Sequence, residues 1–591
     1  MPTIRRVLAL FPLTACFLAL APAALAATYF VARQDPTAAD SNTGTVSHPW
    51  KTLSRAAQAP LKPGDTVLVK SGAYRETVNI RVSGRPGRPI TFAAAPGAKV
   101  VVKGSDVVTG HWEQFTGDPS VKEPYPNAFT SVWRIKLRDD YFAGMPPDER
   151  YISSVFQDDT HGLQQIGPDH IYRNDQYQKI TNIGRGLSDI FPGAYFFDQP
   201  TQMLYVCISG DPNWYLWEVG TRGFVFDIEN AHDVILRGFQ VRHNRQPGGQ
   251  WSMASVGGSE RVLVEDCDFS YSDFCGFGMG RCRNCVVRRC TLTHNGDTGA
   301  ALGWCTDCKI QGCSVMFNNT RHFEEGWAAG GIKNIPVNVR CSVDGCEVAY
   351  NQGTGVWFDT GNVACRITNN VIHDNDANGV HYEINEGGGL IANNLIFSNG
   401  GRGIYISGSQ HVWIVYNTVA ENNQGIVVMP REAPNSVTHD MVRNNLLLYN
   451  DVEGEGGPLG CDLTLYMGDD ANGPRTAMTN HSDHNGYLAG NGTPMLRQHW
   501  NPNNTLPAWQ KRYREDLHSR ALPLAYSIRA SAFRLDPKAG AKLGFADPLP
   551  VQTDWRQPDP TQVGATIRAW PSQTKLMADT TRPRITSGRP Q

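Results

Sequence analysis

The chain has 591 residues, of which 54 are Lys or Arg, 56 are Asp or Glu, and 40% are hydrophobic. The charge is nearly balanced and no run of like charges stands out, which argues against a basic surface that follows a nucleic-acid backbone. The apolar fraction is too high for a disordered chain and is sufficient for a large core.

Residues 1–26 have the features of an export signal peptide. Arg5 and Arg6 precede an apolar run, and the sequence Ala-Leu-Ala at 24–26 suits a cleavage site, so we expect cleavage near Ala26 and a secreted or periplasmic protein. The sequence LTAC at 13–16 also resembles a lipobox, which leaves a lipoprotein signal as the alternative. No later stretch is long and apolar enough to span a membrane.

Residues 27–110 are predicted to hold an N-terminal cap and the first coils of a repeat. A strand is expected first, then a short amphipathic helix near residues 50–59, then coils that follow the PGD turn at 63–65. The helix would cover the open end of the stack, where an unpaired sheet edge would otherwise be exposed. Residues 111–220 break the repeat and are expected to form a β-rich insertion.

Residues 221–455 contain a repeated phrase, apolar-x-apolar-x-x-(Cys or Asn)-x-apolar. Its sixth position falls at 267, 290, 313, 346, 370, 394, 417 and 445. The period is close to 23 or 24 residues, with short alternating strands, turn residues and no helical stretch. This pattern predicts an all-β chain folded as a right-handed parallel β-helix. Residues 456–591 are predicted to hold fading coils and a Pro-rich tail, with one helix near 506–519.

The cysteines follow the same period. Cys282-x-x-Cys285 and Cys305-x-x-Cys308 have the spacing of a four-thiolate zinc site, but the two pairs are also 23 residues apart, which is one coil. We therefore expect buried thiols stacked from coil to coil. Disulfides between adjacent coils and a zinc site remain the alternatives.

One strand of each coil is predicted to present a polar outer face. Aligned from residue 330 onward, these strands place apolar side chains inward at Ile332, Val356, Val380, Ile404, Ile426, Phe358, Tyr382 and Ile406. Two outward columns result. The first contains Lys333, Trp357, His381 and Tyr405, and the second contains Asp359, Glu383 and Ser407.

Asp359 and Glu383 should be neighbours on adjacent coils, because stacked strands lie about 4.8 Å apart. Retaining glycosidases use two carboxyl groups about 5–5.5 Å apart, whereas inverting enzymes need a wider gap for water. Two carboxylates at this distance repel each other, so one should stay protonated as an acid while the other remains a nucleophile. The predicted spacing therefore favours the retaining mechanism.

Several nearby residues are of the types that sugar-binding sites use. Trp357 and Tyr405 could serve as ring platforms, and His381, Lys333 and Asn385 as hydroxyl partners. The remaining candidates are Glu325 on a ten-residue insertion, Glu386 in the turn after Glu383, and Arg402. The competing interpretation is that these outward residues form only a solvated face.

The segments WFDTGN at 357–362 and HYEINEGG at 381–388 resemble the Asp and Glu segments of glycoside hydrolase family 120. This specific resemblance covers about residues 350–410. It implies a retaining β-xylosidase-like reaction in which Asp359 is the nucleophile and Glu383 the acid/base. The segments PGDTVLVKSGAYRE and FPGAYFFDQPTQMLYV resemble exported β-helix carbohydrate enzymes more generally.

The sequence thus predicts a hydrolase of polysaccharides or oligosaccharides that needs no cofactor or metal. One alternative is a polysaccharide lyase or uronate C5-epimerase, with Lys333 as the base and Ca²⁺ held by Asp359 and Glu383. Another is a non-catalytic carbohydrate-binding surface protein. Neither nucleic acid nor a membrane is an expected partner.

Overall fold

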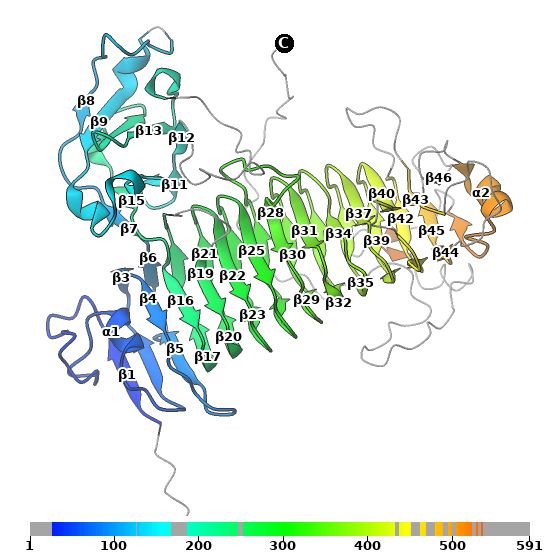
Figure 1. Cartoon of the computed structure of the whole chain (residues 1–591), viewed down its shortest axis with the longest axis horizontal. Helices are drawn as coiled ribbons and strands as arrows, with labels where there is room; N and C mark the ends of the chain where they lie inside the picture. The colour runs from blue at the N-terminus through cyan, green and yellow to red at the C-terminus, as the bar shows by residue number, and fades with distance from the viewer. Residues whose placement is uncertain are drawn as a thin grey trace, which may run out of the picture.

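The computed structural model describes residues 26–125, 127–166, 186–245, 252–431, 437–450, 461–467, 479–488, 494–498 and 504–522, with the backbone of 528–529 and 534–535. The predicted signal peptide falls almost entirely outside these residues. The described chain winds into a stack of coils (Figure 1), and most coils contribute one short strand to each of three long sheets, which are called I, II and III in chain order.

Each of the three sheets has 13 strands. Sheet I contains β1 (Thr28–Val31), β2 (Thr66–Val69), β5 (Ile90–Ala94), β17 (His232–Arg237), β20 (Glu260–Glu265), β23 (Val286–Arg288), β26 (Lys309–Gln311), β29 (Ser342–Asp344), β32 (Val363–Thr368), β35 (Gly387–Ala392), β38 (Val412–Val415), β41 (Met441–Arg443) and β44 (His481–Asp483). Sheet II contains β3 (Gly72–Arg75), β6 (Val100–Lys103), β18 (Gln240–Arg242), β21 (Asp268–Ser270), β24 (Thr291–Thr293), β27 (Ser314–Met316), β30 (Glu347–Ala349), β33 (Val371–His373), β36 (Leu395–Phe397), β39 (Thr418–Ala420), β42 (Leu446–Leu448), β45 (Gly486–Leu488) and β48 (Arg520–Ala521).

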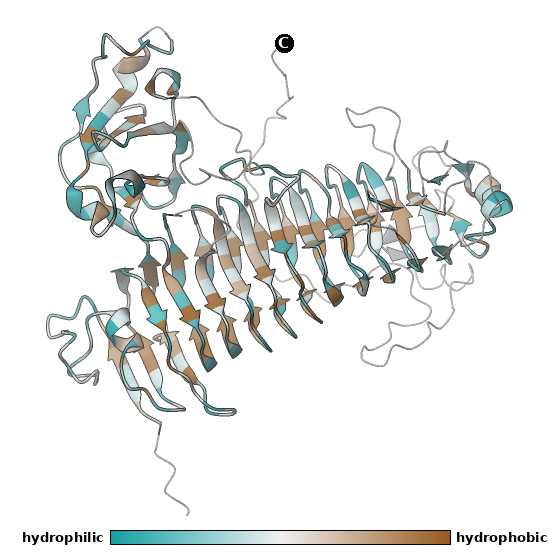
Figure 2. Cartoon of the chain, in the orientation of Figure 1, coloured by the Kyte–Doolittle hydropathy of each residue, from teal (hydrophilic) through white to brown (hydrophobic). Residues whose placement is uncertain are grey.

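Sheet III contains β4 (Val78–Ile80), β16 (Phe226–Glu229), β19 (Ser252–Gly257), β22 (Cys275–Gly280), β25 (Thr298–Gly303), β28 (Gly330–Asn334), β31 (Thr354–Asp359), β34 (Val380–Glu383), β37 (Arg402–Ser407), β40 (Gln424–Met429), β43 (Leu463–Leu465), β46 (Met495–Arg497) and β47 (Asn504–Thr505). Neighbouring strands in the stack pair in parallel, except β46 and β47, which are antiparallel. The apolar side chains of all three sheets point inward and form one continuous core. Hydrophobic residues recur as brown bands along the strands in Figure 2.

Between β6 and β16 the chain leaves the stack and forms two smaller, mostly antiparallel sheets. The first contains β7 (Ser105–Val107), β10 (Val155–Gln157), β11 (His161–Gly162) and β15 (Trp217–Gly220). The second contains β8 (Glu113–Gln114), β9 (Val132–Lys136), β12 (Gln164–Ile166), β13 (Ala194–Asp198) and β14 (Met203–Cys207). This unit lies beside the first coils (Figure 1) and has core clusters of its own. A further pair, β49 (Ile528–Arg529) and β50 (Arg534–Leu535), is antiparallel.

Two short α-helices pack against the ends of the described stack. Helix α1 (Leu53–Ala57) is shorter than expected, because Thr52 caps its start and Pro60 disfavours helical backbone at the residue before it. Helix α2 (Leu506–Tyr513) ends at Arg514, whose φ of 61° is left-handed. Both helices contribute buried side chains to the main core, as an end cap should.

Asparagine side chains form ladders inside the coils. In one ladder, each Nδ2 donates to the Oδ1 of the next coil over 2.9–3.2 Å; its members are Asn370, Asn394, Asn417, Asn445 and Asn485. A second ladder contains Asn295, Asn318, Asn351, Asn375, Asn399, Asn422 and Asn450. A third contains Asn338, Asn362 and Asn385. The ladders satisfy amide groups that would otherwise be buried without partners.

Stacked thiols continue the first and third ladders toward the N-terminus, as the 23-residue spacing predicts. Cys346 lies under Asn370, and Cys305 donates its backbone N–H to Asn338. The cysteines of the described chain are all free and buried: Cys207, Cys267, Cys275, Cys282, Cys285, Cys290, Cys305, Cys308, Cys313, Cys341, Cys346, Cys365 and Cys461. No disulfide links the coils within the described residues.

Candidate active site

The predicted outward columns lie on four consecutive strands of sheet III: β28, β31, β34 and β37. Lys333 pairs in register with Trp357, Trp357 with His381, and His381 with Tyr405. Asp359 and Glu383 are likewise direct register partners on β31 and β34. Their neighbours Phe358 and Tyr382 point into the core, so the two carboxylates lie on the outer face.

Asp359 is held beside a lysine. Its Oδ2 accepts a hydrogen bond from Lys333 Nζ over 2.9 Å, and its Oδ1 accepts one from Thr360 Oγ1 over 2.7 Å. Lys333 Nζ also donates to the backbone oxygen of Trp327 and lies 3.1 Å from the ring centroid of Trp357. Burial lowers the pKa of Lys333 to about 8, although the Asp359 carboxylate opposes this shift.

Glu383 has different partners. Its Oε2 accepts a hydrogen bond from Trp357 Nε1 over 3.0 Å, and its Oε1 forms an ion pair with Arg431. The Glu383 side chain is only 4% exposed, whereas that of Arg431 is 51% exposed. The two acids therefore lie on the same face of the sheet, but different side chains contact each of them.

The first column is a stack of side chains rather than a row of open platforms. Trp357 and His381 stack with centroids 4.8 Å apart, and His381 and Tyr405 with centroids 4.7 Å apart. Lys333 covers the other face of Trp357, and the guanidinium of Arg402 lies 4.2 Å from the Tyr405 ring. The expectation that Trp357 and Tyr405 offer free faces to a sugar is wrong, because their column neighbours occupy those faces.

The expected solvent exposure of this column is also wrong for three members: Lys333, Trp357 and His381 are buried. Burial, followed by the charges of Lys333, Arg402 and Arg431, holds the pKa of His381 well below its usual range. The imidazole is therefore neutral. Its Nε2 lies 3.9 Å from Glu383 Oε2 and has no hydrogen-bond partner within the described chain.

The remaining predicted residues are scattered. Asn385 is fully buried in the third ladder, where its Oδ1 accepts from Asn362 and its Nδ2 donates to the Phe358 carbonyl. It is therefore an interior residue and not a hydroxyl partner. Glu386 and Glu325 are exposed, and partial desolvation, with the nearby charges of Asp376 and Glu324, raises the pKa of Glu325.

Two charged residues near this face, Arg431 and Asp297, are not among the site residues predicted from the sequence. Arg431 follows β40, outside the repeated strand, and the signal that could have found it is a basic residue just beyond a sheet III strand end. Asp297 precedes β25, and burial raises its pKa to about 7. Its Oδ2 accepts from Thr298 Oγ1 over 2.9 Å, while its Oδ1 has no partner in the described structure. The charge of Lys333 acts on Asp297 as well.

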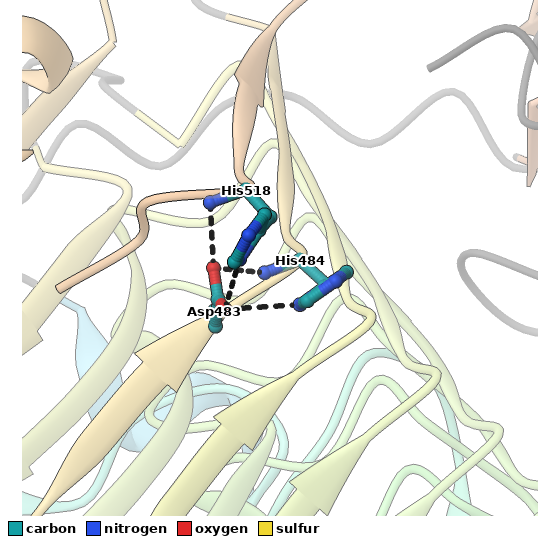
Figure 3. A group of neighbouring side chains, drawn as sticks. All are labelled: Asp483, His484 and His518. Carbon is teal, nitrogen blue, oxygen red and sulfur yellow. Dashed lines mark hydrogen bonds and ion pairs between the residues drawn. The ribbon is translucent and has the colours of Figure 1, made fainter. Parts of the chain in front are cut away.

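Metal-ligand residue types gather at two other places. Asp483, His484 and His518 meet near the C-terminal end of the stack (Figure 3), where His518 Nδ1 lies 2.8 Å from Asp483 Oδ2. The Arg443 guanidinium lies 3.3 Å from His484 Nδ1, which disfavours a cation there. In the second group, Glu218 and His243 are buried and Asp159 is partly exposed, and Lys103 forms ion pairs with both Asp159 and Glu218.

The four thiols with zinc-like spacing form a ring. Cys282 and Cys308 each contact both Cys285 and Cys305. Backbone carbonyl oxygens also accept from the sulfurs, for example Val256 from Cys282 over 3.1 Å and Met279 from Cys305 over 3.4 Å. Carbonyl acceptors favour the neutral thiol, whereas zinc requires the thiolate. The surroundings therefore fit stacked thiols better than a zinc site.

Comparison with known proteins supports the architecture. Residues 225–332 and 325–451 match the family model described as the right handed beta helix region. The structure of XylC in complex with xylose has a TM-score of 0.57 at 16% identity, over 86% of this chain and 88% of that one. The protein is therefore a right-handed parallel β-helix, as predicted.

Two further similarities are weaker. A solved glycoside hydrolase has a TM-score of 0.48 at 13% identity, over 70% of this chain and 95% of that one. The uncharacterized protein YwoF of Bacillus subtilis (strain 168) is 36% identical over 78 residues, which are 13% of this chain and 16% of YwoF. The match thus spans about a sixth of that relative. None of the described helices has the length and apolar character needed to cross a membrane.

Proposed function

We propose that the protein is an exported glycoside hydrolase that cleaves polysaccharides or oligosaccharides by a retaining mechanism, as the resemblance to glycoside hydrolase family 120 implies. The observation that carries this proposal is the direct pairing of Asp359 with Glu383 on adjacent strands. Adjacent strands lie about 4.8 Å apart, which is close to the carboxyl separation of about 5–5.5 Å in retaining enzymes. The likeness in fold to XylC, whose structure holds xylose, is consistent with a saccharide ligand.

In this mechanism Asp359 is the nucleophile. Lys333 and Thr360 hold its carboxylate in place through hydrogen bonds. An Asp359 oxygen bonds to the anomeric carbon as the bond to the leaving oxygen breaks, and Glu383 gives its proton to that oxygen. Glu383 then takes a proton from water, whose oxygen displaces Asp359 from the anomeric carbon. No cofactor enters this scheme.

The lyase or epimerase alternative requires Lys333 as the base. The lowered pKa of Lys333, about 8, favours that role. However, Lys333 is buried and its Nζ already contacts Trp327, Trp357 and Asp359. Calcium binding by Asp359 and Glu383 would have to compete with Lys333 and Arg431. These contacts make the hydrolase the better-supported proposal.

The experiment is a screen of the purified protein against aryl glycosides and uronate polymers, followed by proton NMR of the products. Retained anomeric configuration, and loss of turnover in both Asp359→Asn and Glu383→Gln, would support the proposal. An unsaturated product that absorbs ultraviolet light would identify a lyase. Unchanged ligand affinity in the variants, with no turnover by the wild type on any substrate, would identify a carbohydrate-binding protein.

A further inference from the structure

We propose that the face beside Glu383 binds a sugar unit that carries a carboxylate, and that Arg402 and Arg431 are the residues that recognise it. This inference rests on the proposed function, because it assigns a substrate class to the same site. It depends on the positions and partners of the two guanidinium groups.

Arg431 connects the buried acid to solvent. Glu383 is 4% exposed and Arg431 is 51% exposed, so one side of the ion pair is open to a ligand and the other is not. A guanidinium has five N–H donors and binds carboxylates through two parallel hydrogen bonds. Arg431 can therefore turn its donors toward an incoming carboxylate from the solvent side.

Arg402 has no acidic partner within ion-pair distance in the described chain. Its guanidinium lies over the Tyr405 ring at 4.2 Å, and its buried Nε makes no hydrogen bond there. A cation that is partly removed from water without a counter-charge costs free energy. A bound carboxylate would supply both the missing charge and the missing acceptor.

The balance of charge also favours an anion here. The charges of Lys333, Arg402 and Arg431 all act on His381 and help keep it neutral. Asp359 compensates Lys333, which leaves two arginines near one further carboxylate, Glu383. These five charged groups thus carry a net positive charge, which lies on the side of β34 and β37.

An acidic sugar that drew the Arg431 guanidinium away from Glu383 would change the protonation state of Glu383. The other groups that face this carboxylate are the Trp357 indole and neutral His381, with Asp359 and Ser407 as its register partners on β31 and β37. Without Arg431, repulsion from Asp359 favours uptake of one proton from solvent by Glu383. Binding of the acidic substrate would then produce the protonated acid that the hydrolytic step needs.

The test measures binding apart from turnover. Calorimetry with the Asp359→Asn variant would compare uronate oligosaccharides with the same oligosaccharides after reduction of their carboxyl groups. We expect the acidic forms to bind at least about tenfold more tightly, with an advantage that weakens as salt rises. Arg402→Gln and Arg431→Gln should each remove most of that advantage, whereas Arg366→Gln, on sheet I, should not. Equal affinity of the acidic and reduced forms would overturn the inference.

A pH profile of kcat/KM provides a second readout if the protein hydrolyses neutral aryl glycosides. Arg431→Gln should move the alkaline limb to higher pH, because Glu383 then keeps its proton longer, and Arg431→Lys should not. An unmoved limb would contradict the link between Arg431 and Glu383. Selective binding of acids without hydrolysis would refute the proposed function alone, and hydrolysis without acid preference would refute this inference alone.

Discussion

Trp357 donates its indole N–H to Glu383, one coil further along the stack, over 3.0 Å. The faces of the same ring contact Lys333 on one side and His381 on the other. Lys333 in turn binds Asp359. The Trp357 side chain therefore orients Glu383 directly and Asp359 through Lys333.

Trp357→Phe should keep the ring stack and remove only the indole hydrogen bond. A hydrogen bond to a charged group contributes about 1.5–3 kcal/mol, so we expect kcat/KM to fall by roughly 10- to 100-fold with little loss of thermal stability. Steady-state kinetics and thermal unfolding would measure the two effects. Trp304→Phe, at an exposed tryptophan, is the matched control.

Glu383→Gln and Asp359→Asn should lose activity toward different sets of substrates. Loss of the acid/base should lower the turnover rate by about 10²–10⁴-fold for substrates with poor leaving groups. The rate should fall much less for a substrate with an activated aryl leaving group, which departs without a proton. Loss of the nucleophile should abolish turnover of both substrates and labelling by a mechanism-based fluorosugar. Mass spectrometry of the intact protein would detect the label. Labelling of the Asp359→Asn variant would contradict the assignment of the nucleophile.

Asp297→Asn should stabilise the protein at alkaline pH. The pKa of Asp297 is raised to about 7 in the fold, from 3.8, so the folded state binds more protons than the unfolded state between these values. The stability that Asp297 contributes is complete below about pH 4 and is lost as pH rises through about 7. Chemical denaturation at pH 4 and pH 8 should therefore show a gain for the variant only at pH 8, on the order of a few kcal/mol. An equal difference at both pH values would show that Asp297 does not titrate.

Asn394→Ala should destabilise the stack. Asn394 Oδ1 accepts from both the backbone N–H and the side chain of Asn370, and Asn394 Nδ2 donates to Asn417. Buried groups left without partners cost about 1–3 kcal/mol, which urea denaturation would measure. Glu386→Ala, at an exposed residue eight positions earlier in the chain, should change the free energy of unfolding by less than about 0.5 kcal/mol.

The buried thiols should be unreactive in the native protein. All described cysteines are free and buried, so a reagent in solution cannot reach their sulfur atoms, and burial also raises the pKa of Cys275 to about 11. A colorimetric thiol reagent should label the protein slowly until denaturant is added. Rapid labelling of several thiols in the native state would contradict this prediction.

The fold and the register of the site were predictable because a parallel stack repeats one environment every 23 or 24 residues. That is why the pairing of Asp359 with Glu383 and the inward positions of Val356 and Val380 follow from spacing alone. Burial was not predictable, because it depends on contacts between column neighbours, such as Lys333 on Trp357. Arg431 also lies outside the repeated strand, where the period carries no information.

The stacked register also determines which length changes the protein can tolerate. Removing one whole repeat from the thiol-bearing coils would leave every downstream column aligned and would only shorten the rod. Removing a single residue within β31 would exchange its inner and outer faces, so that a carboxylate would enter the core and an aromatic ring would face water. Natural length variation in such a chain should therefore occur as complete turns of the helix or as loops between strands.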